Sequence, residues 1–177
     1  AYSTILQGHT REVISVTELT GGRIASGSVD RTIRIWDLKK EPTEPGYCTI
    51  LTGHTSLVMS VTELSDGRIA SGSDDHTLRI WDPNKEPTDP EYCTILQGHT
   101  APVTSVTELT DGRIASVSFD RTIRIWDLKK DSTDPGYCTV LEGHTSSVLS
   151  VTELTDGRIA SGSLDRTIRI WGTKTDA

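Results

Sequence analysis

Basic residues are outnumbered by acidic ones in this sequence. The 177 residues include 18 Lys and Arg against 25 Asp and Glu, which gives a formal net charge of −7. A protein that binds nucleic acid mainly through the phosphate backbone needs a basic surface, so this charge argues against that function. No stretch has the length and apolarity of a membrane-spanning helix, and no signal-peptide pattern is present. We therefore expect no nucleic-acid partner, no membrane partner and a cytoplasmic setting.

Cysteine is also sparse, and its spacing argues against zinc binding and against disulfide bonds. Cys48, Cys93 and Cys138 are the only three, at intervals of 45 residues, and Ser3 takes the corresponding place one interval earlier. Zinc sites need ligands that are paired closely in sequence, which this spacing lacks. Equivalent positions in successive repeats should also lie beyond the ~7 Å Cα separation that a disulfide allows. We predict reduced structural thiols, no metal site and no cofactor.

What the sequence does contain is one unit of 45 residues, repeated four times. A Gly-His pair opens the repeated stretch, and a Trp lies near its end. A period of this length marks a repeat architecture. We treat 1–177 as a single domain, divided into repeats 1–45, 46–90, 91–135 and 136–177.

Each repeat contains four short strand patterns, and no window has a helical period. In the second repeat they span 47–51, 58–64, 68–73 and 77–81, each rich in Val, Ile, Thr or aromatic residues. Asp66-Gly67, between the second and third patterns, predicts a two-residue hairpin turn with positive φ at both positions. A four-stranded unit of this size cannot stand alone, so we predict an all-β fold in which antiparallel sheets pack around an axis as a β-propeller.

The repeats resemble the WD40 family of β-propellers. The second copy carries the motifs Gly53-His54, Ala70-Ser71-Gly72-Ser73, Asp75 and Trp81-Asp82, and the other copies repeat them. The resemblance covers the whole chain, with one departure at Gly172, where the family pattern has Asp. It implies blades of four antiparallel strands and a non-catalytic scaffold for protein–protein interaction.

The resemblance also implies one structural network in each repeat, made of His, Ser, Asp and Trp. The serine is the least secure member, because Ser28 and its equivalents share the strand parity of Ser26. A fully satisfied buried network of this kind would make a blade rigid. The four expected tetrads are His9, Ser26, Asp30 and Trp36; His54, Ser71, Asp75 and Trp81; His99, Ser116, Asp120 and Trp126; and His144, Ser161, Asp165 and Trp171.

A nucleophilic function for these serines and histidines is disfavoured. The serines fall within strand patterns, no nucleophile-elbow motif is present, and four equal copies are unlike a single asymmetric active site. We expect no enzyme and no catalytic residues. A hydrolase or a small-ligand-binding propeller is retained only as a remote alternative.

Differences among the copies gather after each Gly-His and before each turn Asp. In WD40 propellers these positions look out from one rim, so the resemblance implies a surface for an unidentified protein or peptide ligand. The alternative is a purely structural or engineered propeller fragment with no partner of its own, which the likeness of the copies favours. The expected rim residues are Arg11, Glu12, Ile14, Val29, Ser56, Leu57, Met59, Asp74, Ala101, Pro102, Thr104, Phe119, Ser146, Ser147, Leu149 and Leu164.

The family resemblance implies six to eight blades in a ring, and this chain has four repeats. The pattern at 1–6 is an outermost strand without its own blade, and 167–171 ends a blade that lacks one. We predict that two chains form a homodimer, head to tail, with eight blades in one ring. Each N-terminal strand would complete the partner's last blade. An open monomer and a four-bladed ring are the alternatives.

Overall fold

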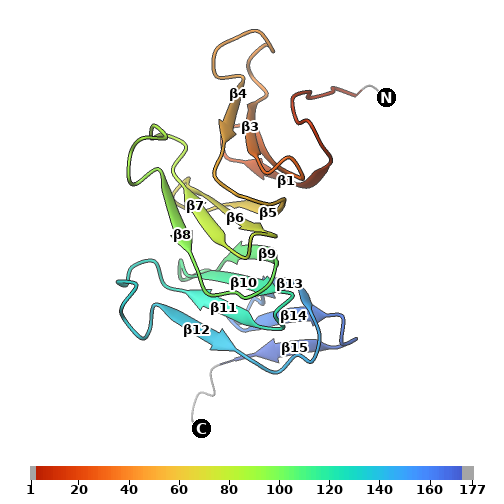
Figure 1. The fold of residues 1–177 in the computed structure, drawn as a ribbon, viewed down its shortest axis with the longest axis vertical. Helices are drawn as coiled ribbons and strands as arrows, with labels where there is room; N and C mark the ends of the chain where they lie inside the picture. The colour runs from red at the N-terminus through yellow and green to blue at the C-terminus, as the bar shows by residue number, and fades with distance from the viewer. Residues whose placement is uncertain (1–2, 173–177) are drawn as a thin grey trace.

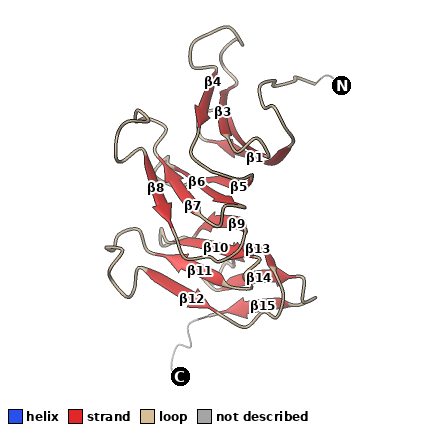
Figure 2. Ribbon diagram, viewed as in Figure 1, coloured by secondary structure: helices blue, strands red, loops and turns tan. Residues whose placement is uncertain are grey.

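The computed structural model describes residues 3–172, and Figure 2 shows strands and loops alone over this range. The strands make three sheets of four and one of three, with antiparallel neighbours throughout. They are β1 (Val13–Leu19), β2 (Arg23–Ser28), β3 (Ile33–Asp37), β4 (Cys48–Leu51), β5 (Val58–Glu63), β6 (Ile69–Ser73), β7 (Leu78–Trp81), β8 (Cys93–Leu96), β9 (Val103–Glu108), β10 (Ile114–Ser118), β11 (Ile123–Trp126), β12 (Cys138–Leu141), β13 (Val148–Glu153), β14 (Ile159–Ser163) and β15 (Ile168–Trp171).

The four sheets follow one another as blades (Figure 1). Neighbouring blades meet through their first strands, so that β1 lies beside β5, β5 beside β9 and β9 beside β13. In each complete blade the strands keep their chain order, and β4, β8 and β12 are the outermost strands. The chain is therefore all-β, with four successive antiparallel blades.

The strand predicted at 1–6 does not form at residues 3–6, which are the part of it that the structure describes. Among residues 3–172, residues 3–6 pair with no strand, and residues 1–2 lie outside the described residues. The same pattern at Cys48–Leu51 does form a strand, because it pairs with β3 along its whole length. A strand needs an edge that satisfies its backbone groups, and the sequence pattern alone does not supply one.

In the second repeat, the turn between the second and third strand patterns is also longer than predicted, whereas Gly21 and Gly22 at the same place in the first repeat both have positive φ. The Gly67 N–H donates to the Leu64 carbonyl at 2.9 Å, and the Leu64 N–H donates to the Arg68 carbonyl at 2.8 Å. Gly67 has φ +86°, whereas Asp66 is not among the residues with positive φ. The loop therefore has three residues, a type I turn followed by a glycine bulge, and not the two-residue turn that Asp-Gly suggested.

A second three-residue turn joins the second and third strands of each blade. The His76 N–H donates to the Ser73 carbonyl, and His76 has φ +69° without being glycine. The equivalent residues, at φ between 69° and 74°, are Arg31, Arg121 and Arg166. This left-handed conformation is unfavourable for residues with a Cβ atom, so each of these turns carries some strain.

The hydrophobic core is divided among the interfaces between blades. One cluster joins Ile33, Ile35 and Leu51 of the first blade to Val58 and Val61 of the second, and two similar clusters follow. Gly27 lies so close to the next blade that an added Cβ would come within 2.7 Å of the Val58 side chain. Glycine at this position therefore allows the two sheets to approach closely.

Candidate functional site

The tetrad of the second blade forms one chain of hydrogen bonds. His54 Nδ1 lies 2.7 Å from Asp75 Oδ2, and His54 Nε2 lies 2.8 Å from Ser71 Oγ. The Trp81 Nε1–H donates to the same Ser71 oxygen at 2.8 Å. These four residues join the loop before β5, strand β6, the turn after it and strand β7.

The other three blades repeat this geometry within 0.1 Å. Their histidines lie 2.6 to 2.8 Å from the aspartates and 2.7 to 2.8 Å from the serines. Their indole N–H groups donate to the serines at 2.8 to 2.9 Å. All sixteen residues expected in the tetrads therefore lie in four equivalent networks.

One assignment of protons satisfies every atom of such a network. A neutral His54 donates from Nδ1 to the Asp75 carboxylate and accepts at Nε2 from the Ser71 hydroxyl, which in turn accepts from Trp81. The rings of His54 and Trp81 also pack edge to face, with centroids 5.7 Å apart. Ser71 is completely buried, so its hydroxyl cannot reach a substrate in the folded chain. The arrangement suits a structural network better than nucleophilic catalysis.

Threonine is a fifth member that the sequence analysis missed. Thr77 donates to Asp75 Oδ1 from both its backbone N–H and its hydroxyl, at 3.0 and 2.6 Å. The Thr55 backbone N–H donates to the other oxygen at 3.0 Å. The signal was available, because a threonine stands two residues after the turn aspartate in every copy. The equivalent residues are Thr32, Thr122 and Thr167.

These hydrogen bonds keep the aspartate charged. Burial by itself raises the pKa of Asp75, but the hydrogen bonds from His54, Thr77 and the Thr55 backbone outweigh it and hold the pKa well below its usual range. Hydrogen bonds likewise lower the pKa of the equivalent aspartates in the other blades, Asp30, Asp120 and Asp165.

The second serine of each blade forms hydrogen bonds with backbone groups and not with the tetrad side chains. The Ser73 hydroxyl donates to the Leu57 carbonyl at 2.8 Å and accepts from the Asp75 N–H at 3.1 Å. It therefore ties the turn to the loop after the Gly-His pair. Ser71 is the tetrad serine, because it alone of the two contacts both His54 and Trp81.

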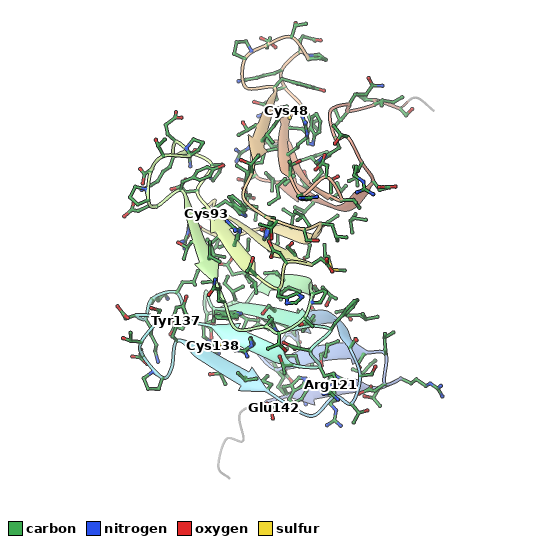
Figure 3. All side chains as sticks on the ribbon, viewed as in Figure 1. Cys48, Cys93, Arg121, Tyr137, Cys138 and Glu142 are labelled. Atoms are coloured by element: carbon green, nitrogen blue, oxygen red, sulfur yellow. The ribbon has the colours of Figure 1, made fainter. Side chains whose placement is uncertain are left out.

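An arginine packed on each buried tryptophan is another feature that the sequence analysis missed. Arg79 lies over the Trp81 ring, with 5.6 Å between its guanidinium carbon and the ring centroid. Its Nη1 donates to the Cys93 sulfur at 3.7 Å. The three cysteines, each free, lie one apiece on β4, β8 and β12 (Figure 3). Burial raises the pKa of the Cys93 thiol despite the neighbouring arginine, which makes it a poor nucleophile.

The structure brings the two variable segments of each blade together. The Phe119 N–H, before the turn aspartate, donates to the Pro102 carbonyl, after the Gly-His pair, at 3.0 Å. The same bond recurs in the other blades, from Val29 to Glu12, from Asp74 to Leu57 and from Leu164 to Ser147. Each blade therefore presents one variable surface made of two hydrogen-bonded segments, which we call the rim.

Four of the expected rim residues lie within strands and not in loops. Each occupies the β-bulge at the start of the blade's first strand, where the pairing register shifts. They are Ile14, Met59, Thr104 and Leu149. Thr104 donates its hydroxyl to the Val148 carbonyl of the next blade at 2.7 Å, so this residue also links two blades.

Exposure differs among the apolar rim residues. Phe119 is 40% exposed, and Ile14, Leu149 and Leu164 are also exposed. Leu57 and Met59 are half-buried, so they offer less apolar surface to a partner than Phe119 does. A comparison of the repeat sequences cannot reveal this difference in exposure.

Among residues 3–172, no helix could cross a membrane, and no group of three or more His, Cys, Asp or Glu side chains could hold a metal ion.

The molecule is a repeat domain of four-stranded antiparallel blades, each carrying the same buried network. The family described as "WD domain, G-beta repeat" matches residues 2–37, 46–82, 90–127 and 136–172, and the chain belongs to this WD40 family. Members are generally non-catalytic and typically serve as protein-interaction scaffolds. The comparison with curated proteins found no match.

Proposed function

We propose that this chain is a non-catalytic scaffold that binds a protein or peptide through the rim. The observation that carries the proposal is the hydrogen-bonded pairing of the two variable segments in every blade. Invariant networks hold these segments in place while their side chains differ from blade to blade. Rigid presentation of variable loops is how many binding domains achieve specificity.

Apolar side chains at the rim support this function. Phe119 and Leu164 stand at equivalent turn positions of neighbouring blades and are both exposed. Their counterparts Val29 and Asp74 are half-buried, so the four blades offer four different surfaces. Exposed aromatic and aliphatic residues among polar neighbours are typical anchors for a partner.

Peptides selected from a random phage-displayed library against the purified chain would test the proposal. Peptides that bind the rim should lose at least ten-fold in affinity against Phe119→Asp and keep it against Leu38→Asp. Leu38 is a matched control, because it is 50% exposed in a loop at the opposite end of its strand. Peptides that depend on the 39–45 loop and ignore Phe119 would contradict the proposal.

We also propose that two chains complete one eight-bladed ring, with the N-terminal segment of each as the outer strand of the other's last blade. The outer edge of β15 is unpaired within the described residues, and residues 3–6 correspond by the 45-residue period to Cys48–Leu51. The register of β3 with β4, in which Ile33 faces Leu51, transfers to Ile168 facing Leu6. An unpaired edge favours this kind of addition.

The solution mass tests the ring. Light scattering coupled to size exclusion should give twice the chain mass of 19.3 kDa. A mass of 19.3 kDa at micromolar concentration would contradict the dimer. Removal of residues 1–7 should weaken association, since it deletes the added strand.

A further inference from the structure

The blades of this chain are joined to one another by a repeated polar contact. The backbone N–H and the hydroxyl of Thr20 donate to the Glu63 carboxylate of the next blade at 2.7 and 2.9 Å. Hydrogen bonds to a charged acceptor are among the stronger ones in proteins. The same two bonds, at the same lengths, join Ser65 to Glu108 and Thr110 to Glu153. We call this contact the blade clamp.

The two ends of the array hold opposite halves of a fourth clamp. Thr155 of the last blade corresponds to Thr110, and Glu18 of the first blade corresponds to Glu63. Thr155 and Glu18 are both exposed, and neither forms a clamp with any residue from 3 to 172. A donor half and an acceptor half are therefore presented at different ends of one molecule.

The apolar faces at the two ends are complementary in the same way. Ile33 of the first blade is fully buried against the second, but its equivalent Ile168 in the last blade is 75% exposed. Val61 of the second blade is 5% exposed, but its equivalent Val16 in the first is 64% exposed. The open face of the last blade also carries a shallow groove, lined by Ser150, Val151, Thr152, Ala160, Gly162 and Ile168.

A backbone hydrogen bond adds to two of the three internal interfaces. The Val61 N–H donates to Ser15 Oγ of the preceding blade at 3.2 Å, and the Val106 N–H donates to Ser60 Oγ at the same distance. At the two ends, the corresponding groups are the Val16 N–H and Ser150 Oγ. For each of these contacts, one partner therefore stands on the first blade and the other partner on the last blade.

We propose that a second copy of this chain covers each end face, head to tail, through the same interface that joins successive blades within one chain. Glu18 of one copy accepts both clamp bonds from Thr155 of the other, and Val16 packs against Ile168. This inference rests on the proposed association of two chains but does not depend on the number of blades. Contact between two like ends is disfavoured, because it would leave Glu18 facing Glu18 and bury no donor for either carboxylate.

Glutamate substitutions at the two ends test this contact by mass measurement. Val16→Glu and Ile168→Glu should each reduce the mass to that of one chain, since each damages both junctions of a head-to-tail pair. Both residues are largely exposed in the single chain, so its circular dichroism should stay unchanged. When the two variants are mixed, a two-chain species should return, because one junction of the mixed pair is unmodified.

The matched control mixes the unmodified chain with a chain that carries both substitutions. Both junctions of that mixed pair are damaged, so no mixed species should form. If the two single variants fail to combine, or if either one alone keeps the dimer mass, the head-to-tail contact is wrong even if the native chain is a dimer. If mixing works but the native mass exceeds two chains, the contact stands and the eight-bladed count fails.

The clamp has its own test, because Glu18 and Glu12 are both exposed acidic residues on the first blade. Glu18→Ala should raise the dissociation constant of the assembly roughly ten-fold or more, as expected for losing hydrogen bonds to a charged group. Glu12→Ala, which removes only an exposed contact with Arg11, should change it less than about two-fold. Equal effects of the two substitutions would overturn the clamp.

Discussion

Replacement of Trp81 by Phe isolates the network's contribution to stability. Trp81 is 1% exposed, and its indole N–H donates to Ser71 Oγ, which is completely buried. Phenylalanine keeps an aromatic ring beside His54 but has no donor. The substitution therefore removes one hydrogen bond and some packing volume while leaving the remaining tetrad atoms in place.

The expected loss is on the order of 1–3 kcal/mol of unfolding free energy. Loss of one hydrogen bond at a buried site contributes about 1 kcal/mol or more, because Ser71 can find no water to replace Trp81. The smaller ring leaves a cavity next to Tyr92 and Arg79, which adds a contribution of similar size. The ring centroids of Tyr92 and Trp81 lie 5.9 Å apart, and the guanidinium carbon of Arg79 lies 5.6 Å from the Trp81 ring centroid.

Urea denaturation followed by far-ultraviolet circular dichroism measures this loss. The matched control is Trp171→Phe, with both Trp substitutions made in the chain that carries Val16→Glu and Ile168→Glu and is expected to stay monomeric. In the single chain, Trp171 makes the same bond to Ser161 but is only half-buried in the last blade. We expect a clearly smaller effect there, since water can replace part of what is lost. An unchanged denaturation midpoint for Trp81→Phe would refute the structural role of the network.

Two further predictions concern acid and backbone strain. Because hydrogen bonds hold the folded pKa of Asp75 below its ordinary value of 3.8, the stability they contribute is fully present above that value and is lost as the pH falls below it. Urea midpoints should therefore drop below about pH 4, and a flat profile down to pH 3 would contradict this. Arg121, labelled in Figure 3, has φ +74° in its turn, so Arg121→Gly should gain up to about 1 kcal/mol in thermal unfolding. Arg121→Ala should gain nothing, and equal gains would show that strain is not the cause.

The blades could be predicted from the sequence because their signals are local and repeated. Strand patterns such as 58–64 combine β-branched residues with turn residues on both sides, and β5 occupies almost the same range. The loop around Gly67 was less accessible, because Asp-Gly fits both a two-residue and a three-residue turn. The bulge at Met59 could not be predicted, since it depends on how β5 pairs with β6 and leaves no mark in residue type.

Burial could not be predicted from residue identity, and the four copies show why. Ile33, Ile123 and Ile168 occupy one repeat position and share the same local sequence, yet the first two are fully buried and the third is 75% exposed. What differs is whether another blade follows. In a repeat array, burial depends on nearest neighbours as well as on the unit itself. The end blades therefore have the apolar faces of inner blades without the neighbours that those faces fit, and association with another blade of the same kind would bury them.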